Sequence, residues 1–275
     1  MADRVAVEQG DAGQAGASAR TVDRITLPPR ATAHDVIRLN NMHRGSAPLD
    51  VLRAVLVDRL AGDIALVSSF GAESAILLDL AARIDPAVPV LFLDTGKNFP
   101  ETLAYRDTLI AHIGLTNVTT LYPDADELAA RDDKGLRWSF DPDGCCEIRK
   151  VRPLERALAG FDATISGRKA FQSATRANLP HFEIDGDTTR LKVNPLASWT
   201  KADLDAYVAE RNLPPHPLVA QGYPSIGCAP CTSKVLPGED PRAGRWRGWE
   251  KTECGLHGEV TPLPPAPDGS EDPVF

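Results

Sequence analysis

The stretch Ile64-Ala65-Leu66-Val67-Ser68-Ser69 runs directly into Phe70-Gly71-Ala72-Glu73-Ser74, and this junction decides the fold. The short apolar run is typical of a buried β-strand, and the polar residues after it indicate a turn. We expect a helix next, over residues 73–83. A buried strand that turns into a helix in this way is the repeating unit of parallel α/β sheets.

The same unit recurs along the chain. Helices are also expected between residues 35 and 60, and from Thr200, as N-cap, to residue 211, with Asp203 three residues after the cap. The remaining expected elements are strands at 88–93, 118–122 and 163–166 and helices at 101–113 and 147–159. This alternation predicts an α/β fold with a doubly wound, mostly parallel sheet.

The two ends of the chain differ from the part between them. Residues 1–30 are rich in Gly, Ala, Asp and Gln without apolar periodicity, so we expect a disordered leader. The domain that binds substrate and cofactor is expected over residues 31–240, followed by a flexible C-terminal segment over 241–275. The chain has no secretory signal, no membrane-length apolar run and only five cysteines, so we expect a cytoplasmic protein without a membrane partner.

The loops that follow the first two strands contain the candidate nucleotide-binding residues. The first loop stands where a strand meets a helix, so its hydroxyl groups and the free helix amides can bind a phosphate. An ordinary turn with serine caps is the alternative for this loop alone. Open α/β sheets bind ligands at the carboxyl ends of their strands, so two polar loops there favour a nucleotide pocket. The candidates are Ser68, Ser69, Gly71 and Ser74 in the first loop and Asp94, Thr95 and Gly96 in the second.

The charge balance limits the kind of ligand. A formal net charge of -8 counts against a broad nucleic-acid surface, so an anionic ligand should be bound by a few local cations. Charge runs are usually solvated, but one cationic stretch follows the strand at 163–166, on the same edge as the two loops. A second stretch interleaves arginines with tryptophans. The candidate cations are Arg168, Lys169 and Arg176 in the first stretch and Arg242 and Arg245 in the second.

Five cysteines carry the strongest chemical signal. Cys145 and Cys146 are adjacent, Cys228 and Cys231 form a Cys-x-x-Cys pair, and Cys254 stands alone. Four thiolates are the usual ligands of an iron-sulfur cluster, so the two pairs are its expected ligands. The odd cysteine is then available as a nucleophile.

The cysteine pattern allows other interpretations. The segment Cys228-Ala229-Pro230-Cys231 could be a thioredoxin-like redox motif, but the prolines and glycine that soon follow leave little room for the helix that such a motif begins. A zinc site with four thiolates stays open, although directly adjacent ligands are unusual for zinc. A disulfide between Cys145 and Cys146 is disfavoured in a reducing compartment. The polar surroundings of Cys254 disfavour a buried, inert thiol.

Together these segments resemble the assimilatory adenylyl-sulfate reductases, in the branch that carries an iron-sulfur cluster. The resemblance runs from about Ser68 to His257 and depends on three motifs in order. They are Cys145-Cys146-Glu147-Ile148-Arg149-Lys150-Val151-Arg152-Pro153, Cys228 to Cys231, and Lys251-Thr252-Glu253-Cys254-Gly255-Leu256-His257. It implies an adenine nucleotide α-hydrolase-like (ATP-pyrophosphatase-like) fold. That group usually has Ser-Gly-Gly-x-Asp-Ser in its first loop, and Phe70 and Glu73 depart from it, which suits a sulfonucleotide rather than ATP cleavage.

The resemblance implies thioredoxin-dependent reduction of adenosine 5'-phosphosulfate to sulfite and AMP, in sulfate assimilation and cysteine biosynthesis. Cys254 would attack sulfur and release AMP, leaving a thiosulfonate on the enzyme. Thioredoxin or a related dithiol protein would then attack the Cys254 sulfur and release sulfite. Lys150, Arg242 and Arg245 match cationic positions of the family and would neutralise the sulfate and phosphate oxygens. His257 is also assigned to the substrate site.

The resemblance further implies one 4Fe-4S cluster that does not cycle electrons. This cluster could tune the charge around Lys150, four residues after Cys146, or staple the structure, and the sequence leaves both roles open. Two other activities are alternatives: a 3'-phosphoadenosine 5'-phosphosulfate reductase, whose branch generally lacks the four cluster cysteines, and an iron-sulfur, ATP-dependent tRNA thiolase. A zinc-binding module without activity is the non-enzymatic alternative. Whether the chain forms a homo-oligomer is left open.

Overall fold

A six-stranded sheet forms the centre of the molecule in a computed structural model, which describes residues 31–172, 176–186, 190–251 and 253–256. The expected leader, residues 1–30, lies outside the described residues. In spatial order the strands are β3, β2, β1, β4, β6 and β5. Their bounds are β1 Ile64–Ser68, β2 Val90–Leu93, β3 Val118–Leu121, β4 Ala163–Ile165, β5 Phe182–Ile184 and β6 Leu191–Val193.

Neighbouring strands are parallel except for β5, which pairs antiparallel with β6. The mostly parallel sheet and the four expected strands are thus confirmed, with ends that shift by one or two residues. Strands β5 and β6 were not expected. Each is only three residues long, and so short a run shows no reliable alternation.

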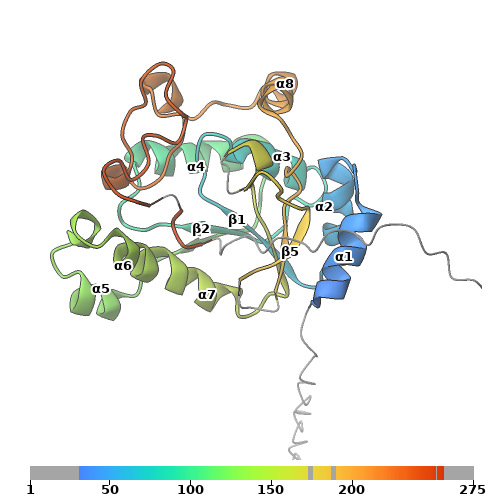
Figure 1. Ribbon diagram of the computed structural model, residues 1–275, viewed down its shortest axis with the longest axis horizontal. Coiled ribbons are helices and arrows are strands. Elements are labelled where there is room, and N and C mark those ends of the chain that lie inside the picture. Colours follow the sequence, from blue (N-terminus) through green and yellow to red (C-terminus); the bar gives the residue numbers. More distant parts are fainter. Residues whose placement is uncertain (1–30, 173–175, 187–189, 252, 257–275) are drawn as a thin grey trace, which may run out of the picture.

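Helices cover both faces of the sheet (Figure 1), as a doubly wound fold requires. Helices α3 and α4 lie on one side and α6 and α7 on the other, while α1 contacts the edge strand β5. The helices are α1 Ala33–Met42, α2 Pro48–Leu56, α3 Ser74–Ala82, α4 Pro100–Ile113, α5 Ala125–Arg131, α6 Pro142–Cys146, α7 Arg152–Leu158 and α8 Lys201–Arg211.

The helix expected over 147–159 begins earlier, with α6, and continues through a π-helical turn, η2 (Glu147–Val151), into α7. Helix α5 was not expected, because it buries none of its residues and so has no apolar periodicity. The cap predicted for α8 is confirmed. Thr200 and Asp203 form a reciprocal capping box, in which each side chain accepts a hydrogen bond from the other residue's backbone N–H.

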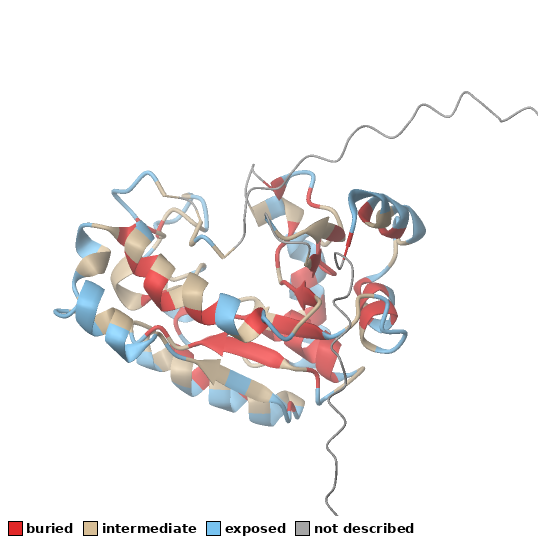
Figure 2. Cartoon of the chain, turned by 90° about the horizontal axis from the view of Figure 1, so that it is seen from below, coloured by how far each residue is buried: buried red, intermediate tan, exposed pale blue. Residues whose placement is uncertain are grey.

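Alternate residues of the central strands pack into two separate cores. Leu66 and Phe92 belong to the larger core with α1 to α4 and α8, whereas Ala65 and Leu91 face α7. This is the two-residue period of a strand that is covered on both faces. Buried residues accordingly concentrate in the sheet and on the inner sides of the helices (Figure 2).

The chain after α8 returns across the carboxyl edge of the sheet. Asn98, just after β2, forms a backbone bridge with Cys228, and the Trp246 amide donates to the Cys231 carbonyl at 3.0 Å. The side chain of Lys251 contacts Asp143 at α6, and Trp246 is buried. Parts of the segment expected to be flexible thus contact the rest of the molecule through Trp246 and Lys251, while residues 247–250 are exposed. Among the described residues, none of the helices has both the length and the apolar character needed to span a bilayer.

Candidate functional site

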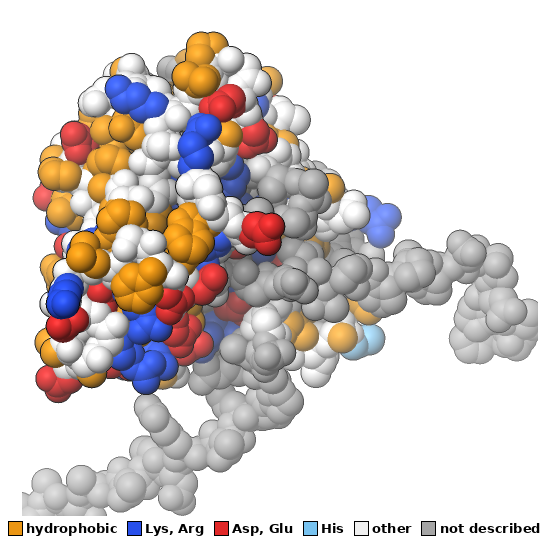
Figure 3. Space-filling model, turned by 60° about the vertical axis from the view of Figure 1, so that its left-hand side comes forward, with side chains coloured by type: hydrophobic (Ala, Val, Ile, Leu, Met, Phe, Trp, Pro, Cys, Tyr) orange, Lys and Arg blue, Asp and Glu red, His pale blue; other side chains and the backbone are white. Residues whose placement is uncertain are grey.

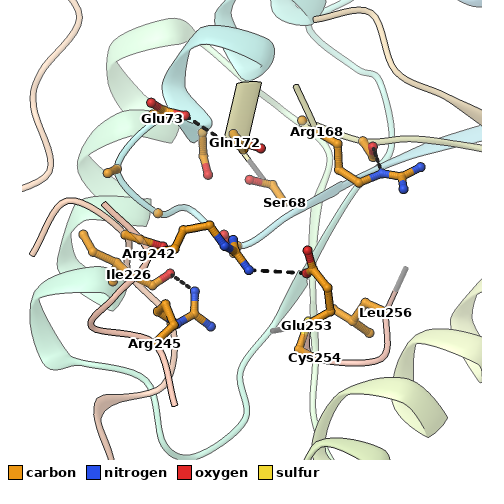
Figure 4. Close-up of a pocket in the computed structure, with 18 of the residues that line it drawn as sticks. Ser68, Glu73, Arg168, Gln172, Ile226, Arg242, Arg245, Glu253, Cys254 and Leu256 are labelled. Carbon is orange, nitrogen blue, oxygen red and sulfur yellow. Dashed lines mark hydrogen bonds and ion pairs between the residues drawn. The ribbon is translucent and has the colours of Figure 1, made fainter. Parts of the chain in front are cut away.

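A cavity of about 540 Å³ opens at the carboxyl edge of the sheet, within the size range of small-molecule and cofactor sites. It is lined by the loops after β1, β2 and β4, by η2 and by the C-terminal part of the chain (Figure 4). Together with the predicted cluster ligand Cys228, twelve of the predicted substrate-binding and catalytic residues line it: Ser68, Ser69, Gly71, Ser74, Thr95, Lys150, Arg168, Lys169, Arg176, Arg242, Arg245 and Cys254. The structure therefore brings together segments that are far apart in the sequence.

The loop after β1 owes its shape to Phe70. This residue has a φ of +48°, a conformation that side chains other than glycine rarely adopt. Its ring is fully buried and packs edge-on against Phe92 with centroids 5.4 Å apart, while its amide donates to the Ser68 hydroxyl at 3.2 Å. Burial of the ring offsets the backbone strain. Phe70, which stands where the related group usually has Gly, is thus part of the hydrophobic core.

Gly71 allows the C-terminal half of the chain to approach this loop. A Cβ atom at Gly71 would lie 3.4 Å from the Ile226 carbonyl oxygen and 3.3 Å from the Ser69 hydroxyl. The first of these contacts falls at the short end of ordinary van der Waals contact and the second is tighter than most real Cβ contacts, so a side chain here would have little room. Glycine therefore keeps this side of the cavity narrow.

The first cationic stretch is paired with carboxylates. Lys169 donates to Glu73 at 2.8 Å, and Gln172 donates to the same Glu73 oxygen at 3.0 Å. Arg176 donates to Gln172 at 2.9 Å and to Glu253 at 2.5 Å. Burial lowers the pKa of both Lys169 and Arg176, so their charges depend on these partners. The sequence had indicated the cations, but Glu73, Gln172 and Glu253 were not assigned, because counter-ions show no local spacing.

Arg168 faces away from the others, toward the edge strands. Its guanidinium contacts Glu183 of β5 and lies 3.3 Å from the Asn194 side chain. The residue is buried, and burial lowers its pKa to about 10. Arg168 therefore lines the cavity and also links it to the edge strands.

Arg245 lies on the opposite wall, stacked 4.4 Å from the centroid of the Trp246 ring. Its Nη1 donates to the Ile226 carbonyl at 3.5 Å, while its buried Nε has no hydrogen-bond partner among the described residues. A Cβ at Gly227 would overlap this guanidinium, so a side chain there would force the guanidinium to shift. An unpartnered buried donor beside a cavity is what an anionic ligand would satisfy.

Lys150 of η2 joins this cavity to a second, smaller pocket, because its side chain lines both. It makes no hydrogen bond or ion pair with another described residue. Burial by itself lowers the pKa of Lys150, but the nearby thiols of Cys228, Cys254 and Cys146 outweigh it and raise the pKa above its ordinary value. A cation with no carboxylate partner can interact with a bound anion.

The small pocket is lined by all four predicted cluster ligands, Cys145, Cys146, Cys228 and Cys231. Burial raises the pKa of Cys145, Cys146 and Cys231 to about 11 in each case. All five cysteines are free thiols, so the disulfide alternative is not formed. Within the described residues no three His, Cys, Asp or Glu side chains are grouped tightly enough for one metal ion.

A buried ion pair ties the cysteine-bearing turn to the loop after β2. Arg149 donates to Asp132 at 2.6 Å and 3.2 Å, and to the Thr95 carbonyl at 2.8 Å. The Thr95 hydroxyl in turn lies 3.3 Å from the sulfur of Cys228. Arg149 thereby positions one pair of cysteines relative to the other. No role had been assigned to Arg149 or Asp132, which are seventeen residues apart in the sequence.

Residues 63–234 match the Phosphoadenosine phosphosulfate reductase domain. The chain belongs to the phosphoadenosine phosphosulfate reductase family. Adenosine 5'-phosphosulfate reductase from Mesorhizobium japonicum is 47% identical over 88% of this chain and 94% of that protein. The enzyme of the same name from Chelativorans sp. is 52% identical over 71% of this chain and 79% of that protein. Phosphoadenylyl-sulfate reductase from Candida auris, in a crystal structure with phosphate, matches with a TM-score of 0.64 at 27% identity, covering 74% of this chain and 98% of that chain.

The fold implied by the resemblance is confirmed by this family membership. Two predicted substrate residues that the structure describes, Asp94 and Gly96, do not line the cavity. Asp94 accepts a hydrogen bond from the Gly96 amide at 3.0 Å, so both residues form a turn beside the cavity rather than its wall. His257 lies outside the described residues. Of the three residues assigned in the loop after β2, the structure brings only Thr95 to the cavity.

Proposed function

We propose that this chain reduces adenosine 5'-phosphosulfate to sulfite and AMP, with thioredoxin or a related dithiol protein as the reductant. One observation carries the proposal: the lone thiol of Cys254 lines the same nucleotide-sized cavity as Lys150, Arg242 and Arg245. A nucleophile among cations fits an electrophilic, anionic substrate. The names of the most similar relatives support the choice of sulfonucleotide.

In the first step the Cys254 thiolate attacks the sulfur of the sulfate group. A sulfur–sulfur bond forms, the bond from sulfur to the bridging oxygen breaks, and the electron pair leaves with AMP. AMP is a weakly basic leaving group, so the cations can stabilise it without a proton donor. Lys150 and Arg245 suit this role, because neither is paired with a carboxylate among the described residues.

In the second step a thiolate of the dithiol protein attacks the Cys254 sulfur. The sulfur–sulfur bond to the sulfonate breaks, and sulfite leaves with the electron pair, so the substrate sulfur is reduced by two electrons. The second thiol of the partner then releases Cys254 and closes the partner's own disulfide. The position of Cys254 on a segment after the last helix, rather than in the sheet, suits access by a protein partner.

Cys145, Cys146, Cys228 and Cys231 would bind the proposed 4Fe-4S cluster. The gathering of four thiols in one pocket fits this donor set, and their burial means that a bound metal is needed to hold them as thiolates. These four thiols would hold a cluster of several iron atoms, so they need not be grouped around one ion. When bound, the cluster would supply fixed charge beside Lys150, which lines both spaces.

The 3'-phosphorylated nucleotide is the nearest alternative substrate, because the Candida auris relative is named for it. An additional phosphate needs additional cations, and Arg168 and Lys169 already face Glu183 and Glu73. We therefore expect a higher kcat/KM for adenosine 5'-phosphosulfate. Equal values for the two nucleotides would contradict this choice, and ATP consumption would instead favour a thiolase.

The decisive experiment isolates Cys254. Cys254→Ser should abolish sulfite release while the absorbance of the anaerobically purified protein and nucleotide binding survive, because a serine hydroxyl is a far weaker nucleophile. Wild type given substrate without a dithiol should gain the mass of one sulfonate on the Cys254 peptide. Reduced thioredoxin should remove it. Mapping of that mass to Cys228 or Cys231 would refute both the nucleophile and the ligand assignments.

A further inference from the structure

Glu253, the residue directly before Cys254, lies between two cations of the cavity. Its Oε1 accepts a hydrogen bond from Arg176 Nη2 at 2.5 Å, and its Oε2 lies 3.5 Å from Arg242 Nη2. The Arg176 side chain is 7% exposed and that of Glu253 is 27% exposed. Figure 4 shows the carboxylate turned toward Arg242 with Cys254 beside it. A negative group of the protein thus occupies part of a cavity suited to anions.

Arg176 is held in place from the core side. Its Nη1 donates to Gln172, which itself donates to Glu73 in the loop after β1. Its Nη2 donates to Glu253. A buried guanidinium with no anion beside it would be unfavourable, so the empty cavity needs a negative partner at this point. Glu253 meets that need, and the same contact draws Cys254 to the cavity.

An anionic substrate creates a conflict at this position. Both the substrate and Glu253 are negative, and like charges at short range repel strongly where water is partly excluded. Arg176 is anchored by Gln172, whereas Glu253 belongs to the segment that follows the last helix. The carboxylate is therefore the partner that can move.

We propose that Glu253 is a positioning residue that holds Cys254 at the empty cavity and gives up its place between Arg176 and Arg242 to an oxygen of the bound phosphosulfate. The exchange frees Cys254 to approach the sulfur only when substrate is present. This inference rests on the proposed function. It predicts that the Glu253 carboxylate competes with the nucleotide, in contrast to a purely structural ion pair, which would persist in the complex.

Competition between the Glu253 carboxylate and the nucleotide predicts the direction in which substitutions change the binding affinity. Glu253→Gln should tighten binding of adenosine 5'-phosphosulfate about tenfold, the size of one charge-assisted hydrogen bond. Glu253→Asp keeps the negative charge, but its side chain is one methylene shorter and should no longer bridge the two arginines. This variant should therefore also bind adenosine 5'-phosphosulfate more tightly than the parent protein does. Glu250→Gln is the matched control, since Glu250 is an exposed carboxylate three residues earlier.

Binding is measured by calorimetry in a Cys254→Ser background, where no turnover occurs. Unchanged or weaker binding in Glu253→Gln would overturn the inference. Tighter nucleotide binding in Glu253→Gln but not in Glu253→Asp would also overturn the inference, because the loss of negative charge at long range would then explain the effect. The control should stay within about twofold of its parent, as expected of an exposed surface charge.

A second measurement needs no nucleotide. With Cys254 intact and the cavity empty, alkylation of the Cys254 peptide by iodoacetamide, followed by mass spectrometry, should be several-fold faster in Glu253→Gln than in wild type or Glu250→Gln. Equal rates would overturn the holding role. Faster alkylation in a protein that binds no sulfonucleotide would refute the proposed function instead, and would leave the contact between Glu253 and its arginines established.

Discussion

The buried imidazole of His216 should make the stability of this protein depend on pH in a defined way. His216 fixes the segment that leads from α8 to Cys228 onto α4. Its Nδ1 accepts a hydrogen bond from the Leu218 amide at 3.2 Å, so the proton is on Nε2, which lies 3.1 Å from the Thr102 hydroxyl. Burial lowers the pKa of His216 from 6.5 to about 4, against a smaller opposing effect of the Glu101 carboxylate.

The sign follows from where the proton binds. Between the unfolded pKa of 6.5 and the folded pKa of about 4, the unfolded chain binds a proton that the folded protein does not, so stability falls as the pH falls. Near pH 5.5 the unfolded imidazole is mostly protonated, which lowers the free energy of unfolding by about 1.3 kcal/mol relative to pH 7.5. The loss of unfolding free energy is nearly the same for any folded-state pKa of His216 below about 5, because protonation of the imidazole in the unfolded chain accounts for most of it.

The assay compares wild type with His216→Gln, whose amide keeps an N–H donor for Thr102 but does not titrate. Urea unfolding of each protein is followed by tryptophan fluorescence at the two pH values, and the difference between the proteins cancels the other titrating groups. Wild type should lose about 1.3 kcal/mol more than the variant. His112→Gln is the control, because His112 is exposed on α4, the helix that His216 contacts. If wild type and His216→Gln lose the same stability, the imidazole is not buried in its neutral form.

Three further predictions concern the site. Cys146→Ser should lose most of the bound iron and the brown colour, because an alkoxide poorly replaces a thiolate; full iron content would contradict the ligand assignment. Arg149→Met should lower the free energy of unfolding by about 3 to 5 kcal/mol by leaving Asp132 buried and unpaired, with most of it regained in Arg149→Met/Asp132→Leu; a loss below about 1 kcal/mol would refute the pair's importance. Lys150→Met should lower kcat/KM at least about a hundredfold with iron retained, and Lys150→Arg should recover part of it; unchanged kinetics would exclude Lys150 from the substrate site.

Surface charge on the face of the molecule seen in Figure 3 is mixed, with Lys and Arg side chains interspersed among acidic and hydrophobic ones. The cavity differs from this face, because it gathers Lys150, Lys169 and several arginines. This contrast agrees with the inference from net charge that an anionic ligand is bound by local cations. It also explains why overall composition says little about the site.

The amino-acid sequence by itself determined the elements that depend on neighbouring residues. Apolar runs predicted β1 to β4, the Thr200 and Asp203 pair predicted the start of α8, and the junction at Ser68 predicted one wall of the cavity. These features are local, because hydrophobic periodicity and capping involve residues a few positions apart. Polar residues that follow parallel strands could likewise be assigned to one edge of the sheet.

The tertiary structure alone decided which of these residues meet. It turned Asp94 beside the cavity rather than into it, paired the unassigned β5 with β6, and set Glu253 against Arg176 across 77 residues of sequence. No local pattern encodes such contacts, since they depend on the path of the whole backbone. Cations that the sequence assigns to ligand binding, such as Arg176, are thus also paired with carboxylates of the protein. A buried cation needs such a partner even before a ligand binds.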